Sequence, residues 1–196
     1  MMMLPRNSYR YAWIAVALLL TGSANADIAT TRHNLSVSGP GPIQSTTEQE
    51  ICVYCHTPHR ARTTTGLLWN REDSTAVYAQ YQSSSLKAIV GQPTGASKLC
   101  LSCHDGTIAL GALVSRQTEI PFAGGIRFLP EGDTRLGTDL SDDHPLSFVY
   151  DESLAIDNGE LASPSTLTSA VKLDSSEQLQ CTACHDAHED SFGKFL

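Results

Sequence analysis

The chain has 196 residues, a formal net charge of −8 and only 7% aromatic residues. An acidic balance of this kind disfavours nucleic-acid binding, for which a basic face is expected. Few aromatic residues, together with Ser, Thr, Gly and Pro spread along the whole sequence, leave little material for a core made of side chains. We therefore expect a mostly irregular fold with short α-helices and a few short strands, in which another group fills part of the interior.

The first 26 residues have the pattern of an export signal. Arg6 and Arg10 precede an apolar run at 12–20, and Ala-Asn-Ala at 24–26 supplies the small residues that signal peptidase requires. The apolar run is too short to span a bilayer, and an uncleaved anchor helix, the alternative, does not explain the cleavage pattern. We expect a signal peptide at 1–26 and one domain at 27–196, exported to the periplasm or the cell exterior without membrane insertion. Loss of the two arginines would give this domain a net charge of −10.

The first part of this domain has weak local patterns. Residues 27–50 are typical of an extended arm, which Gly-Pro-Gly-Pro at 39–42 interrupts. Residues 60–97 form a polar connector around an apolar Leu-Leu-Trp cluster at 67–69. We expect this cluster to pack on the core or on a porphyrin rather than to recognise a ligand.

Further along the chain the patterns predict short regular elements. Apolar spacing predicts a helix over 99–114, although two internal glycines weaken it. The segment 116–140 is rich in Gly and charge and is expected to be a loop. Alternation predicts a strand at 146–150 and a small hairpin formed by 171–173 and 178–180.

All six cysteines fall in three C-x-x-C-H motifs, at 52–56, 100–104 and 181–185. In c-type haem attachment, two thiols add to the vinyl groups of the porphyrin and the adjacent histidine binds the iron from one face. Two intervening residues let a single helical turn present both sulfurs to one porphyrin edge. The motifs therefore predict three haem c groups, attached through Cys52, Cys55, Cys100, Cys103, Cys181 and Cys184, with His56, His104 and His185 as iron ligands.

Three other uses of these cysteines explain the pattern less well. A framework of three disulfides is common in exported proteins, but it does not account for a histidine directly after each motif. Zinc sites usually combine two half-sites into one tetrahedron, and three equal motifs cannot be divided in this way. Thioredoxin-like chemistry would place the motif in a strand-helix unit, which none of the three motifs has.

Each haem iron needs a second axial ligand, and the sequence restricts the choice to histidine. The only methionines are the first three residues, which belong to the predicted signal. Four histidines lie outside the motifs: His33, His59, His144 and His188. We predict three low-spin, bis-histidine haems, which lack an open position and therefore suit electron transfer. One of the four histidines is then surplus.

Two of these histidines have an informative spacing. His59 and His188 each follow a motif histidine by three residues, which keeps them on the same side of the nearest haem if the segment is helical. Each is therefore expected to serve a neighbouring haem. The middle motif has no such histidine and must take its ligand from a distance, and we assign His144 to it.

With these motifs and their flanks, the sequence resembles the multihaem c-type cytochromes of metal-respiring, sulfur-respiring and related bacteria. The flanks that carry the resemblance are His33-Asn-Leu-Ser-Val-Ser, Cys55-His-Thr-Pro-His59, Lys98 to Gly106, and Asp143-His-Pro-Leu-Ser-Phe148. The resemblance implies a fold organised by closely stacked haems, bis-histidine ligation and respiratory electron transport with redox partner proteins such as other cytochromes. Some similar proteins form homopolymeric filaments.

The leading hypothesis is a non-enzymatic electron-transfer protein. The alternative is a multihaem reductase of a small oxyanion or nitrogen oxide, which would need one five-coordinate iron below a polar pocket. No segment of the sequence indicates such a pocket. Similar proteins continue past a Gly-Lys-Phe-Leu segment into a further motif, so we also expect this chain to be a shortened relative of proteins with four or more haems.

Overall fold

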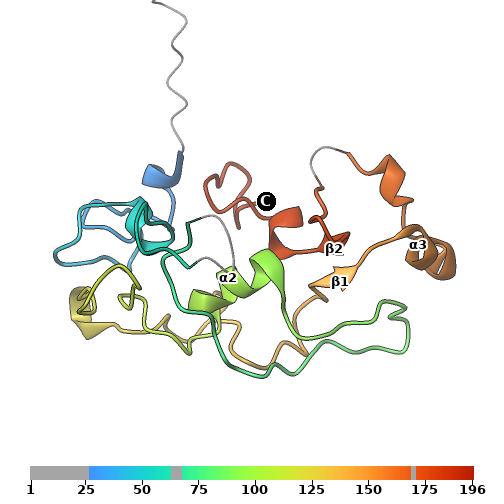
Figure 1. The fold of residues 1–196 in the computed structure, drawn as a ribbon, viewed down its shortest axis with the longest axis horizontal. Helices are drawn as coiled ribbons and strands as arrows, with labels where there is room; N and C mark the ends of the chain where they lie inside the picture. Colours follow the sequence, from blue (N-terminus) through green and yellow to red (C-terminus); the bar gives the residue numbers. More distant parts are fainter. Residues whose placement is uncertain (1–26, 63–67, 169–170) are drawn as a thin grey trace, which may run out of the picture.

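A computed structural model describes residues 27–62, 68–168 and 171–196. The predicted export signal at 1–26 lies outside the described residues. The described part is mostly irregular, with two α-helices and one two-stranded sheet (Figure 1). This confirms the expectation of a mostly irregular fold with short helices and a few short strands. Within the described ranges, no helix is long and apolar enough to cross a membrane.

Helix α2, Gly95–His104, lies at the centre of the molecule and contains the middle C-x-x-C-H motif (Figure 1). The helix starts after Thr94, whose backbone is extended. It ends at His104, because Gly106 adopts a left-handed conformation with φ of 69° that turns the chain away. The predicted helix over 99–114 was therefore wrong in its extent. The apolar residues that follow the helix belong to loops.

The sheet pairs two short strands that are far apart in the sequence. Strand β1, Phe148–Val149, is antiparallel to β2, Gln178–Leu179, and Phe148 lies opposite Leu179. The predicted strand at 146–150 is confirmed in a shorter form. The predicted hairpin was wrong in its partner, because β2 pairs with β1 and the segment 171–173 is not in a strand.

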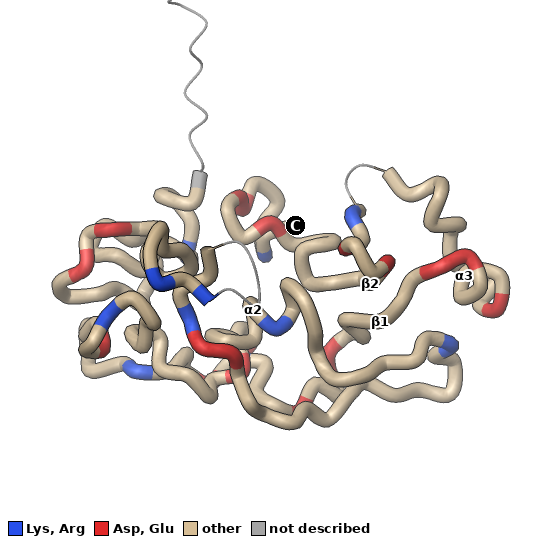
Figure 2. Tube along the Cα trace, viewed as in Figure 1, with Lys and Arg blue, Asp and Glu red and all other residues tan. Residues whose placement is uncertain are grey.

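Helix α3, Glu152–Asn158, follows β1 and was not predicted. Its N-terminus is capped by Asp151, whose carboxylate accepts a hydrogen bond from the Leu154 amide at 2.8 Å. Its C-terminus is closed by Gly159, which is left-handed with φ of 75°. Acidic residues are spread over the chain and gather around this helix (Figure 2).

Short 3-10 turns make up the remaining helical structure. They are η1 Asp27–Thr30, η2 Cys52–Tyr54, η3 Ala123–Gly125, η4 Pro164–Thr166 and η5 Cys181–Ala183. Two of them, η2 and η5, form the first three residues of the first and third motifs. Among the described residues, three of the seven helical elements thus lie at the motifs.

The core contains two small apolar clusters, and residues of α2 contribute to both. The first consists of Tyr54, Leu110, Leu113, Ile120 and Phe122, and the second of Tyr78, Leu101, Leu140 and Leu146. Cysteines of the first and middle motifs pack on the first cluster, and Cys181 of the third motif packs on the second. The core therefore lies against the motifs rather than apart from them.

The apolar cluster predicted at 67–69 is only partly in this core. Trp69 is buried, with 8% of its surface exposed, whereas Leu68 is 56% exposed. Residue 67 lies outside the described residues. Trp69 contacts the ring of His56 edge to face, with centroids 5.9 Å apart, so it packs directly against the first motif.

Candidate functional site

The three motifs share one local geometry. In the first motif the His56 amide donates to the Cys52 carbonyl at 2.8 Å, and in the third the His185 amide donates to the Cys181 carbonyl at 2.9 Å. The middle motif forms the last turns of α2. Each motif therefore carries its two cysteines and its histidine on a single helical turn, which brings both sulfurs to the same side.

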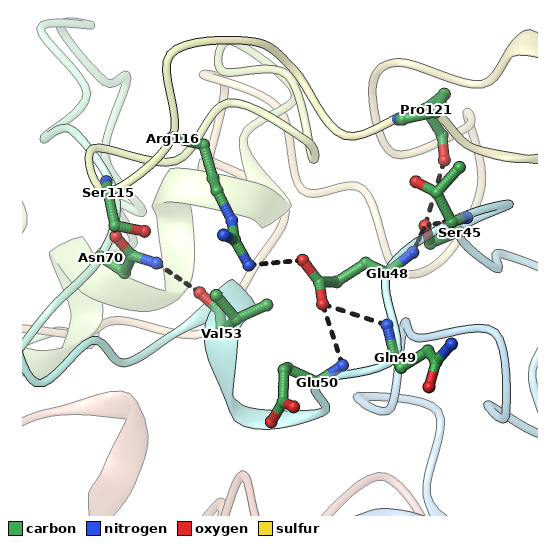
Figure 3. A network of polar contacts seen from close by, with 10 residues as sticks. Ser45, Glu48, Gln49, Glu50, Val53, Asn70, Ser115, Arg116 and Pro121 are labelled. Atoms are coloured by element: carbon green, nitrogen blue, oxygen red, sulfur yellow. Dashed lines mark hydrogen bonds and ion pairs between the residues drawn. The ribbon is translucent and has the colours of Figure 1, made fainter.

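The first motif is fixed by Asn70, which is fully buried. The Asn70 amide donates to the Cys55 carbonyl at 2.9 Å, and its side-chain nitrogen donates to the Val53 carbonyl at 2.6 Å. Its side-chain oxygen accepts from the Ser115 amide at 3.0 Å (Figure 3). One asparagine side chain thus joins the first motif to the loop at Ser115.

A second network of polar contacts stabilises the segment that precedes the first motif. Glu48 forms an ion pair with Arg116 at 2.7 Å and accepts hydrogen bonds from the Gln49 and Glu50 amides (Figure 3). Ser45 in turn accepts a hydrogen bond from the Glu48 amide at 2.9 Å. These contacts order the loop that leads into η2.

The middle and third motifs are joined through Gln180, which is buried. Its side-chain oxygen accepts hydrogen bonds from the Ser97 amide at 3.2 Å, the Ser97 hydroxyl at 2.7 Å and the Ser147 hydroxyl at 3.0 Å. The Cys181 amide donates to the Ser97 hydroxyl at 3.0 Å. Helix α2 and η5 are therefore held side by side.

Cysteines from different motifs lie close together. Burial raises the pKa of the Cys55 thiol to about 12, the neighbouring Cys103 adds to the rise, and the charge of Arg71 opposes it. A hydrogen bond between the Cys100 and Cys181 thiols raises the pKa of Cys100 and lowers that of Cys181. The middle motif thus contacts the first motif with one cysteine and the third with the other.

No disulfide joins the six cysteines, all of which lie in the described ranges. In the same ranges, no group of three or more His, Cys, Asp or Glu side chains is placed to hold a bare metal ion. The thiols are grouped in pairs, each with its adjacent histidine.

Each motif histidine faces one histidine from outside the motifs. The ring centroids are 6.2 Å apart for His56 and His188, 6.1 Å apart for His33 and His104, and 6.4 Å apart for His144 and His185. The first and third of these pairs have nearly parallel rings, at 10° and 14°, and the second pair is nearly perpendicular at 82°. Three separate pairs therefore have almost the same spacing.

Hydrogen bonds orient the rings of these pairs. In His33, His104 and His185, Nδ1 lies 3.0, 2.6 and 2.9 Å from the carbonyl oxygens of Ala187, Thr134 and Lys194. An imidazole that donates from Nδ1 to a carbonyl keeps Nε2 unprotonated and available as a metal ligand. The ring of His144 has a similar contact with the Pro145 carbonyl at 3.2 Å.

His33 also has an environment that favours the neutral form. Burial lowers the pKa of His33, and the hydrogen bond to the Ala187 carbonyl opposes this effect. Nearby His104 and His188 lower the pKa further. Since a metal binds only the unprotonated ring, these effects favour ligation near neutral pH.

The structure places His144 beside the third motif, whereas the sequence analysis assigned it to the middle motif. Pro145 and Leu146 follow His144, and Leu146 lies in the second apolar cluster, against which Cys181 packs. The histidine that faces the middle motif is His33. The separation of the histidines along the sequence did not indicate that His33 faces the middle motif and His144 the third.

His59 differs from the other three candidates. Its ring is exposed and faces no motif histidine in the described part of the chain. Its backbone is held, because the Thr57 hydroxyl donates to the His59 carbonyl at 2.8 Å. Among the described residues, His59 is thus the candidate that lies outside the three pairs.

Two residues near the motifs carried no signal in the sequence analysis. Phe195 stacks on the ring of His33, and Arg71 is buried beside the first and middle motifs. The last residues are visibly apolar in the sequence, but no pattern indicated that the ring of Phe195 contacts the ring of His33 near the other end of the described chain.

A search against models of known protein families gave no match, and no curated protein matched the sequence.

Proposed function

We propose that the chain is an electron-transfer protein that carries three covalently attached c-type haems. Each C-x-x-C-H motif would bind one haem through its two cysteines and ligate the iron through its histidine. The second axial ligands would be His188 for the first motif, His33 for the middle motif and His144 for the third. The observation that carries the proposal is the spacing of the three facing histidine pairs.

That spacing fits a metal ion between the rings. A bond of about 2.0 Å from a metal to each imidazole nitrogen, and roughly 1.2 Å from each nitrogen to its ring centre, sum to about 6.4 Å between the ring centroids. The three observed separations range from 6.1 to 6.4 Å. Direct aromatic stacking of parallel rings would not need so large a separation.

Unpaired polar groups also fit a haem at the first motif. Nε1 of Trp69 and Nε of Arg62 are buried and have no hydrogen-bond partner among the described residues. Buried N–H groups without partners are costly, and a haem carries two carboxylates that accept hydrogen bonds. Trp69 contacts His56, which places one of these donors next to the proposed iron ligand.

The ligand set favours electron transfer over catalysis. A bound haem iron supplies reversible one-electron chemistry. With a histidine on each side, both axial positions are filled by the protein and no position remains for a substrate. The proposal therefore differs from a multihaem reductase, which needs one open iron.

The contacts between motifs support transfer within the molecule. Cys103 lies beside Cys55, and Cys100 lies beside Cys181, so the middle attachment point adjoins the other two. His185 and His188 belong to one short segment but face partners in different motifs. Haems held at these positions would be close enough to exchange electrons. The predicted signal at 1–26 supports a role outside the cytoplasm, with redox proteins as partners.

The test is to produce the protein in cells that attach c-type haems and to replace the outer histidines one at a time. The intact mass should exceed that of the polypeptide by three haems, and carbon monoxide should barely change the reduced spectrum. His33→Ala, His144→Ala and His188→Ala should each create one haem that binds carbon monoxide.

His59→Ala is the matched control and should leave all three haems low-spin. Fewer than three haems in the unaltered protein, or rapid binding of carbon monoxide by it, would contradict the proposal.

A further inference from the structure

Arg71 is a buried cation whose side chain has no anionic partner in the described part of the chain. It has 0% of its surface exposed. Its guanidinium donates to the Ser102 hydroxyl at 3.2 Å and to the carbonyls of Ser102 at 3.0 Å, Ala109 at 3.0 Å and Leu110 at 2.8 Å. All four acceptors are neutral. No carboxylate of the described ranges forms an ion pair with it, although four other arginines have such a pair.

The position of this charge relates it to two of the three motifs. Arg71 follows Asn70, whose amide is bonded to the Cys55 carbonyl. Its acceptor Ser102 directly precedes Cys103 in α2. The guanidinium therefore lies between the second cysteines of the first and middle motifs, and its charge acts on the Cys55 sulfur.

The hydrogen bonds alone would give Arg71 a structural role, because they tie the first motif to α2 and to the loop at 109–110. A neutral donor could make some of these bonds without the cost of removing a charge from water. What a neutral donor could not supply is a fixed positive charge in a medium of low dielectric constant, where its field is weakly screened.

We propose that Arg71 raises the reduction potentials of the haems at the first and middle motifs. The inference rests on the proposed function. Reduction of a haem adds one electron to the iron, from ferric to ferrous, and a nearby buried cation stabilises the form with the additional negative charge. The third motif packs on the other apolar cluster and has no contact with Arg71 among the described residues, so we expect the smallest effect there.

The test is an optical redox titration of the protein carrying three haems. Arg71→Gln should lower the reduced-to-oxidised ratio of at least one haem about tenfold at a fixed potential, which is about 59 mV for a one-electron couple. Arg127→Gln is the matched control, because Arg127 is exposed and paired with Glu119. The control should leave the potentials unchanged.

Arg71→Lys separates charge from structure. A buried lysine loses its proton more readily than a free one. Titrated from about pH 5 to about pH 9, the Lys variant should therefore resemble the unaltered protein at low pH and approach the Gln variant at high pH. If Arg71→Gln does not accumulate with three haems, the pH dependence of the Lys variant alone tests whether the charge of Arg71 raises the potentials.

Unchanged potentials in Arg71→Gln, or a Lys variant whose potentials run parallel to those of the unaltered protein at every pH, would overturn the inference. These outcomes are distinct from a failure of the proposed function. The latter would appear in the unaltered protein as fewer than three covalent haems by mass.

Discussion

The ring of His33 stacks on the ring of Phe195, with centroids 4.1 Å apart and planes 27° apart. The same histidine is hydrogen-bonded to the Ala187 carbonyl, so the C-terminal segment fixes a side chain near the start of the described chain. In Figure 1 the first described residues and the C-terminal segment lie next to each other, above α2 in this view.

Loss of this stack should weaken the proposed ligation at the middle motif. Aromatic pairs of this kind contribute about 0.5 to 1.5 kcal/mol beyond the burial of their area. We expect Phe195→Ala to give a partly high-spin haem that binds carbon monoxide slowly, as measured by absorption spectroscopy. Phe192→Ala is the control, because Phe192 is 86% exposed. Equal effects of the two substitutions would argue against a specific role for the stack.

The angle between facing rings should distinguish one haem from the other two. The rings of His33 and His104 are nearly perpendicular, whereas the other two pairs are nearly parallel. Parallel imidazoles separate the energies of the two iron d orbitals of π symmetry, and perpendicular imidazoles leave them nearly equal. Electron paramagnetic resonance of the oxidised protein should therefore show two types of low-spin signal in a two-to-one ratio.

The minor signal should have the larger maximum g value and should vanish in His33→Ala. Three signals of one type, or loss of a major signal in this variant, would be inconsistent with the ring geometry.

Replacement of Gln180 should destabilise the contact between the middle and third motifs. Gln180→Leu removes the acceptor of the Ser97 and Ser147 hydroxyls and leaves buried donors unpaired. We expect a loss of about 2 to 4 kcal/mol in the free energy of unfolding, since each unpaired buried group costs about 1 to 3 kcal/mol. Denaturant unfolding of the haem-loaded protein measures it. Gln117→Leu, at an exposed position, should change little.

Tyr78 should make the stability depend on alkaline pH. Its buried hydroxyl donates to a carboxylate oxygen of Asp105 at 2.6 Å. Burial and this hydrogen bond raise the pKa of Tyr78 above its ordinary value. The unfolded chain then loses the phenol proton at a lower pH than the folded chain does. The associated stability is present below about pH 10 and is lost as the pH rises further.

Tyr78→Phe should cost about 1 to 3 kcal/mol at neutral pH through loss of a hydrogen bond to a carboxylate, and should flatten the alkaline decline. Circular dichroism during denaturation at several pH values measures both effects. Tyr81→Phe is the control, because the Tyr81 hydroxyl has no hydrogen-bond partner among the described residues. An alkaline decline that is the same in all three proteins would contradict the role of Tyr78.

The local geometry of the motifs could be predicted from the sequence, because the short spacing of the two cysteines and the histidine allows one helical turn to carry all three. The irregular fold class could be predicted as well, from the composition. The extent of α2 could not, because apolar spacing continued past Gly106, whose left-handed backbone ends the helix. The predicted strand partner of β2 was also wrong. The buried side chain of Gln180 joins the end of β2 to Ser147 beside β1, and this long-range contact cannot be read from the local pattern.

The facing histidines could be named from the sequence as a set but not paired. His144 was assigned to the middle motif because it is separated from every motif along the sequence, and it lies beside the third. Pairing depends on which loops return to which motif, and that is decided by contacts such as the one between His33 and Ala187, 154 positions apart in the chain. Short-range periodicity contains no information on contacts of this range.

The contact of His33 with the last residues of the chain has a consequence for how the molecule is made. A growing polypeptide emerges from its N-terminus, so the segment at 27–62 is complete long before Ala187 and His188 exist. His56 and His33 must wait for these residues, because both have their partners at the opposite end. Closing loops of this length is slow compared with forming local turns. The first part of the chain is therefore the earliest to be synthesised and among the last to reach its final geometry.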